Sequence, residues 1–186
     1  MLGRWRGTTS AQPRVLVCNL GSGFRSVRDA DAATYKRWYK HVDVVDVNSC
    51  TELMTLVKRG SDIIHLSAMV APGGWLSGGD SLVQGTDLIA RCSEHQVKLL
   101  WIASENRSEH YISGFRAAGK RLNLVLTISR NGESFAGFLD GLLSRISQGA
   151  PLPGAWAAMA PQTPGCAQPD LPSCIFFAGW PDARLR

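Results

Sequence analysis

The amino-acid sequence predicts an α/β fold, a three-layer sandwich with a mostly parallel central sheet of about six strands. Short apolar runs alternate with amphipathic segments of helical length along most of the chain. Residues 97–106 begin as an apolar run with little alternation, which is typical of a strand buried on both faces in the middle of a parallel sheet. The run ends at Ser104, Glu105 and Asn106, and ligands bind at the carboxyl ends of such strands.

The composition is that of one globular domain, with 186 residues of which 45% are hydrophobic and 19% are charged. We expect this domain to span residues 14–180, between a flexible basic tail at 1–13 and a short tail at 181–186. The net charge is +5, but the sequence shows no long basic stripe interleaved with aromatic residues. The charge therefore indicates a solvated surface and argues against a nucleic-acid partner.

The first half of the chain predicts three strands and two helices. The strands are expected at residues 14–20, 41–47 and 62–67, the second of them half exposed because its apolar residues alternate. The helices are expected at residues 29–40 and 51–58. Asn48 or Ser49 can cap the second helix, and Gly60 ends it. Residues 70–79 are rich in glycine and are expected to form a loop.

The second half continues the alternation of helices and strands. Its expected helices cover residues 84–95, 109–118, 133–147 and, more briefly, 155–159. Its expected strands are the central run from residue 97, then 122–129 and 174–179. Residues 161–172 contain several prolines and are expected to be a loop. The last strand is apolar and bounded by Pro172 and Pro181, which places it at a sheet edge where another copy or a partner can pair.

Several classes of protein are excluded by what the sequence lacks. The sequence has no run of eighteen apolar residues, which a membrane helix would need. Its N-terminus also lacks the apolar segment that a secretory signal contains. The five cysteines are scattered without C-x-x-C spacing, which favours reduced thiols in the cytoplasm. The four histidines are not paired at ligand spacing, so we expect neither a metal nor another cofactor.

Two of the strand ends carry a resemblance to a known family. The run from Asp62 through His65 to Val70, then Gly78-Gly79-Asp80, then Leu100 to Glu105, resembles the CHAT proteases of the caspase-like clan. Residues 114–119, 138–149, 155–160 and 176–180 are similar to later segments of that family, so the resemblance runs from about residue 14 to 180. It implies a caspase-like fold, a catalytic His-Gly pair after one strand and a nucleophilic cysteine after the next.

This chain departs from the family at both catalytic positions. Met69 and Val70 stand where the family has its His and Gly, and Ser104 stands where it has the cysteine. A thioether cannot accept a proton, and a serine hydroxyl depends on a positioned base for its nucleophilicity. The resemblance therefore predicts a catalytically inactive, CHAT-like domain that binds protein. It implies an adaptor or regulatory subunit of a bacterial signalling or defence assembly.

The predicted binding cleft lies at the strand ends, where Ser67, Met69, Ser104, Glu105 and Asn106 would line it. In this interpretation Met69 is a loop residue packed into the vacated cleft, and Ser104 caps a turn. We expect a partner protein, or a second copy of this chain, to bind in this cleft or at a sheet edge.

Two alternatives keep an activity. In the first, Ser104 is a serine-type hydrolase nucleophile, with His65 or His110 as its base and Glu105 orienting the imidazole. Against it, His65 lies within a strand, where a buried, hydrogen-bonded core histidine is the simpler interpretation. In the second, Asn19 to Gly23 bind a nucleotide as in Rossmann- or flavodoxin-like proteins. The full G-x-G-x-x-G pattern is absent, however, and Arg25 occupies the place where the backbone should approach a phosphate.

Overall fold

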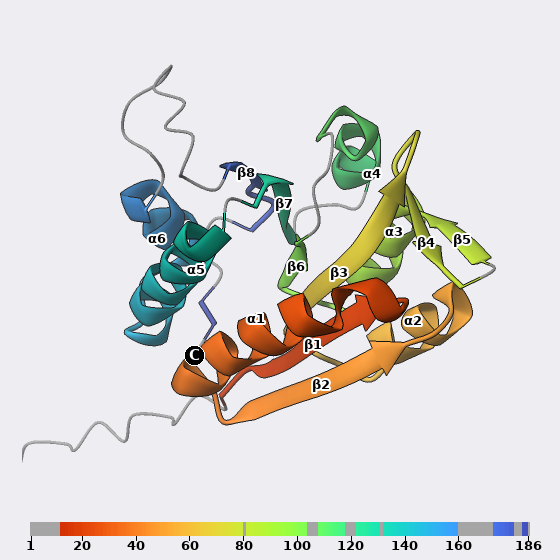
Figure 1. Ribbon diagram of the computed structural model, residues 1–186. Coiled ribbons are helices and arrows are strands. Elements are labelled where there is room, and N and C mark those ends of the chain that lie inside the picture. The colour runs from red at the N-terminus through yellow and green to blue at the C-terminus, as the bar shows by residue number, and fades with distance from the viewer. Residues whose placement is uncertain are drawn as a thin grey trace, which may run out of the picture.

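The chain folds into a sheet with helices on both faces, as shown by a computed structural model (Figure 1). The structure describes residues 12–79, 81–103, 108–117, 122–130, 132–159, 173–180 and 184–185. The strands are β1 Arg14–Leu20, β2 His41–Val47, β3 Ile63–Ala71, β4 Trp75–Gly78, β5 Ser81–Gln84, β6 Leu99–Ile102, β7 Asn123–Ser129 and β8 Ser173–Phe177. The helices are η1 Ser22–Phe24, α1 Arg25–Trp38, α2 Cys50–Val57, α3 Gly85–Glu94, η2 Ser108–His110, α4 Ile112–Ala117, α5 Gly132–Ser147 and α6 Leu152–Met159.

The sheet confirms the predicted fold class. Its main path has the order β2-β1-β3-β6-β7-β8, in which every pair is parallel except β7 with β8. The short strands β4 and β5 form an antiparallel hairpin that extends the end of β3. Among the described residues the last strand, β8, pairs only with β7, which places it at a sheet edge, as predicted.

Two apolar clusters fill the space between the sheet and its helices. On one face, α2, α3 and Tyr111 pack against the sheet through residues such as Leu53 and Leu88. On the other face, α1, α5 and α6 pack against it through residues such as Phe135. Trp101 on β6 is fully buried on this second face, where its ring contacts His65, Phe135 and Phe138. The central strand is therefore buried on both sides, which explains its unbroken apolar sequence.

Local signals mark both ends of α2. The Ser49 hydroxyl accepts a hydrogen bond from the Glu52 amide at 3.2 Å and caps α2. The Glu52 carboxylate in turn accepts a hydrogen bond from the Asn48 backbone amide at 2.8 Å. These two reciprocal hydrogen bonds stabilise the first turn of α2. Gly60 follows α2 with φ 79°, a left-handed conformation that favours glycine.

Three predicted elements are corrected by the structure. Helix α1 begins at Arg25 rather than at residue 29, because Phe24 at its start provides no side-chain cap that would mark the boundary. The expected loop over residues 70–79 is instead the end of β3 and the strand β4. Helix α4 is shorter than the expected 109–118, because residues 108–110 form the separate turn η2. The expected loop at 161–172 lies outside the described residues, as does most of both expected tails.

No helix in the part of the chain that the structure describes is long and apolar enough to cross a membrane. Among the same residues, no group of three or more His, Cys, Asp or Glu side chains is placed to hold a metal ion.

Candidate functional site

The candidate site lies at the carboxyl ends of the parallel strands, where β1 and β3 meet. Strand β2 lies on one side of β1, and β3 lies on its other side. The chain connections at the ends of β1 and β3 therefore run in opposite directions along the sheet. Such a switch point is where open α/β sheets bind ligands. The register places Asn19 beside Ser67 at this point. The Asn19 amide donates to the Gly21 carbonyl at 2.6 Å and its oxygen accepts from Arg28 at 2.8 Å.

Ser67 is the one predicted cleft residue that the structure places inside this region. It is 1% exposed, and its hydroxyl has no hydrogen-bond partner among the described residues. Ser104, Glu105 and Asn106, the other predicted polar residues of the cleft, lie outside the described residues, directly after Ala103.

A buried polar cluster lies on the same face of β3, two residues before Ser67. The His65 side chain is fully buried, and both of its ring nitrogens have partners. Nε2 lies 2.9 Å from the Asp31 carboxylate, and Nδ1 lies 3.1 Å from the Tyr35 hydroxyl. Because an ionised Asp31 can only accept, Nε2 carries the proton and Nδ1 accepts from Tyr35 when the imidazole is neutral.

Arg130, at the carboxyl end of β7, completes this cluster. Its guanidinium donates two hydrogen bonds to Asp31, one to each carboxylate oxygen, and lies 3.9 Å above the ring of Phe135. Burial on its own would raise the pKa of Asp31, but the neighbouring His65 and Arg130 outweigh it and lower that pKa. Burial raises the pKa of Tyr35 well above its ordinary value. We call Asp31, Tyr35, His65 and Arg130 the α1 latch, because they join α1 to β3 and to the end of β7.

The α1 latch bears directly on the hydrolase alternative. A general base needs a nitrogen that can reach the nucleophile's proton, and both nitrogens of His65 are already engaged in a site closed to solvent. His65 is thus the hydrogen-bonded core histidine of the simpler interpretation. His110 lies in η2 and packs on the turn between β3 and β4, where a side chain at Gly74 would come within 2.6 Å of its Cβ.

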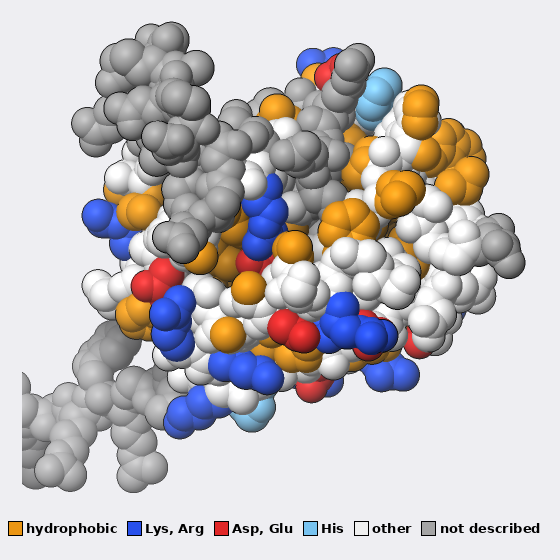
Figure 2. Space-filling view, in the orientation of Figure 1, with side chains coloured by type: hydrophobic (Ala, Val, Ile, Leu, Met, Phe, Trp, Pro, Cys, Tyr) orange, Lys and Arg blue, Asp and Glu red, His pale blue; other side chains and the backbone are white. Residues whose placement is uncertain are grey.

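Met69 does not fill a cleft, which corrects the prediction made for it. It belongs to β3 rather than to a loop, and it is 62% exposed. The hairpin explains the difference, because its register places Met69 beside Ser77 and Ser77 beside Leu82, which is 58% exposed. Met69, Ser77 and Leu82 therefore form a row across three strands, which we call the hairpin row. Figure 2 shows apolar side chains gathered at the upper right, over the end of β3 and the hairpin labelled in Figure 1.

The hairpin is the structural feature of this region that the sequence interpretation missed. A usable signal was present, since two short stretches with alternating apolar residues flank the turn at Gly79-Asp80. Gly79 has φ 59°, as the first position of such a tight turn requires. The glycine content of residues 70–79 concealed the two strands.

The turn after β1 offers little to a phosphate. Arg25 pairs with Asp46 at 3.1 Å, and Arg28 binds Asp29, Asp46 and Asn19. Both guanidinium groups are therefore already used by side chains of the same chain, which weakens the nucleotide-binding alternative.

No protein-family model matches the chain, and no curated protein sequence matches it.

Proposed function

We propose that this chain is a catalytically inactive, CHAT-like domain that binds a protein partner as an adaptor or regulatory subunit of a bacterial signalling or defence assembly in the cytoplasm. The observation that carries the proposal is the hairpin row. Among the described residues, Met69 and Leu82 are the two exposed large hydrophobic side chains, and the fold brings them into one row. Exposed apolar groups that lie together mark interaction surfaces.

Two further observations support a loss of catalysis. At the position that resembles the family's catalytic histidine, Met69 offers a thioether, which cannot accept a proton at neutral pH. His65, the nearest histidine along β3, has both nitrogens engaged and is closed to solvent. The strand order β2-β1-β3-β6-β7-β8, with an antiparallel last strand, is compatible with the caspase-like fold that the resemblance implies.

The proposed partner binds on the exposed side of the hairpin row. The Met69→Gln, Leu82→Gln double variant removes the apolar surface without adding charge, and it leaves the core untouched because both side chains point to solvent. A matched control, Ala33→Gln, changes an exposed residue on α1. A photo-crosslinking residue at position 82, compared with one at position 33, identifies the partner or a second copy of the chain.

The proposal expects crosslinks from position 82 and not from position 33. With the purified partner, the double variant should then weaken binding by about tenfold, while Ala33→Gln binds like the wild type. Equal crosslinking at the two positions would contradict the proposal. Catalytic inactivity is tested separately with a fluorophosphonate probe, because labelling of the wild type that is lost in Ser104→Ala would establish an active serine hydrolase instead.

A further inference from the structure

The amino-terminal end of the parallel sheet collects basic side chains. Each right-handed crossover brings a helix back so that its last turn lies beside the start of the next strand. Lysine and arginine are favoured in those last turns because they interact well with the negative end of the helix dipole. Lys36 in the last turn of α1 and Arg145 in the last turn of α5 follow this rule, and Lys58 directly follows α2. Because the strands are parallel, the ends of these helices lie at the same end of the sheet. Their basic residues therefore form one basic face.

Most of these charges have no acidic partner in the part of the chain that the structure describes. Three basic residues at this end have acidic partners: Arg37 with Asp140 at 3.1 Å, Arg91 with Glu94 at 3.2 Å and Lys98 with Asp62 at 2.7 Å. Seven others form no ion pair with any of the residues that the structure describes. We call them the basic end: Arg14, Lys36, Lys40, Lys58, Arg59, Arg145 and Arg184. All seven are exposed, and Asp43 on β2 is the nearby acid that remains unpaired.

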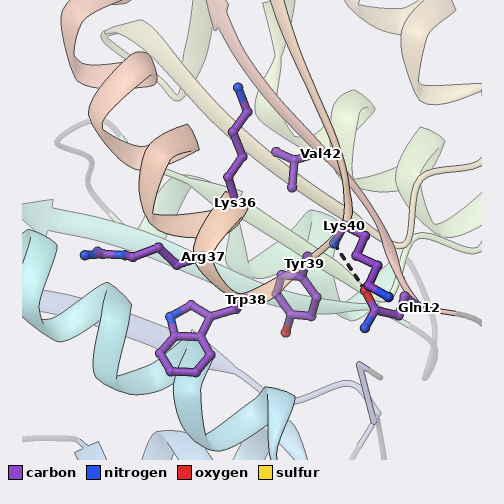
Figure 3. Close-up of a pocket in the computed structure, with 7 residues that line it drawn as sticks. All are labelled: Gln12, Lys36, Arg37, Trp38, Tyr39, Lys40 and Val42. Atoms are coloured by element: carbon purple, nitrogen blue, oxygen red, sulfur yellow. Dashed lines mark hydrogen bonds between the residues drawn. The ribbon is translucent and has the colours of Figure 1, made fainter.

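A hollow of about 480 Å³ lies within the basic end, between the end of α1 and the start of β2. Figure 3 shows Lys36 and Lys40 on either side of Val42, while Arg37 points away toward its own partner. Gln12 closes one side, where its side-chain oxygen accepts from the Lys40 amide at 3.1 Å. In Figure 2, basic side chains gather at the lower left, over the same elements. The hollow thus offers two unpaired cations around an apolar floor.

We propose that the basic end docks an acidic, extended segment of a partner protein, whose carboxylates pair with Lys36 and Lys40 while an apolar side chain rests on Val42. Charge complementarity supports this occupant, because Lys36 and Lys40 are exposed and pair with no acidic side chain among the described residues. The aromatic residues of the hollow argue against nucleic acid. Tyr39 is 4% exposed with its hydroxyl on the Leu185 carbonyl, and Trp38 is half-buried against the neighbouring apolar cluster, so the hollow presents no fully exposed ring for base stacking.

This inference concerns the end of the sheet opposite the hairpin row, so it stands or falls separately from the proposed function. The test uses the whole chain and a fluorescein-labelled poly-glutamate peptide, with binding followed by fluorescence anisotropy at about 0.05 M and about 0.15 M salt. Lys40→Glu should weaken binding by about fivefold, and Lys36→Glu with Lys40→Glu by more than tenfold. Binding should also weaken at the higher salt concentration, because these charges are exposed.

The matched control is Arg116→Glu. It changes the net charge as much as Lys40→Glu does, but at an exposed position of α4, far from the basic end in Figure 1. Unchanged peptide binding by this control and by the Met69→Gln, Leu82→Gln variant supports the proposal. Equal weakening by Arg116→Glu and Lys40→Glu overturns it in favour of a diffuse charge effect. Tighter binding of a single-stranded RNA of similar charge, lost in Lys40→Glu, overturns it in favour of nucleic acid, and no peptide binding at low salt overturns it outright.

Discussion

The two ends of the sheet use charged side chains in opposite ways. At the carboxyl end, Arg130 is largely covered and pairs with Asp31, which is buried against His65 in the middle of β3. At the amino end, Lys36 and Lys40 are exposed and have no acidic partner among the described residues. A buried charge is costly unless it is paired, whereas an exposed lysine is solvated by water and needs no partner.

This difference teaches what each end can be used for. Charges at the carboxyl end are committed to holding α1 against β3 and β7, so changing them should alter the stability of the fold. Charges at the amino end contribute little to the fold and remain available for binding. Apolar groups show the same division, since those of the sheet interior are covered while the hairpin row is exposed.

The largest expected effect comes from breaking the α1 latch. Asp31→Ala removes the buried carboxylate that accepts hydrogen bonds from His65 and Arg130, and we expect it to lower the free energy of unfolding by about 3–5 kcal/mol. Asp140→Ala is the control, because its carboxylate also binds an arginine but is 36% exposed, and it should cost about 1 kcal/mol or less. Urea denaturation measures both, and similar losses for the two variants would contradict the contrast between the ends.

Acid should weaken the latch in the same way. The pKa of Asp31 is lowered in the folded chain, so its contribution is present above the unfolded pKa of about 3.9 and is lost as the pH falls through the folded value. We expect the free energy of unfolding to fall more steeply below about pH 4 in the wild type than in Asp31→Asn. The pKa of Asp46 is also lowered, chiefly by its hydrogen bond from Arg25. Asp46 is present in both the wild type and Asp31→Asn, so it affects the two pH curves equally. Parallel pH curves from urea titrations would show that Asp31 does not carry the effect.

A smaller loss is expected where the hairpin meets the end of β1. A methyl group added at Gly78 would lie 2.2 Å from a methyl carbon of Leu20, so Gly78→Ala must push the hairpin outward and should cost about 1–3 kcal/mol. Gly137→Ala is the matched control on the exposed side of α5, where no atom lies within 4 Å, and it should stabilise the fold by about 0.5–1 kcal/mol. Thermal unfolding of the two variants should therefore shift in opposite directions.

Ser67→Ala should change stability little or even raise it by up to about 1 kcal/mol, because the hydroxyl it removes is buried without a partner. By contrast, Thr127→Val removes the oxygen that accepts from the buried Trp101 indole at 3.0 Å and should cost about 1–3 kcal/mol. If Ser67→Ala were as destabilising as Thr127→Val in urea denaturation, its hydroxyl would have to be hydrogen-bonded in solution.

The smallest effect is expected at the amino end. Lys36→Ala and Lys40→Ala remove exposed, unpaired charges and should change the free energy of unfolding by no more than about 0.5 kcal/mol. A loss of several times this size, measured in the same denaturation experiment, would show that the basic end contributes to the fold itself.

Much of the fold could be predicted from the sequence because hydrophobic periodicity reports burial directly. The unbroken apolar run before Ala103 predicts a doubly buried strand, and the contacts of Trp101 agree with it. Ser49 and Gly60 mark α2 through backbone chemistry that acts within a single turn. The start of α1 is not predicted, because Phe24 gives no capping signal. The β4–β5 hairpin is not predicted either, because the glycines of residues 70–79 are equally typical of a loop.

The candidate site depended far more on tertiary structure. The sequence by itself determined the α/β class, the central strand and the absence of a histidine at the position of Met69. Only the folded chain decided that His65 is closed off by Asp31 and Tyr35, and that Met69 lies in a row with Leu82. The reason is physical: periodicity records whether a residue is buried, whereas its partners come from other segments. The partners of His65 and Asp31 lie thirty or more residues away, and only the packing of the sheet against its helices brings them together.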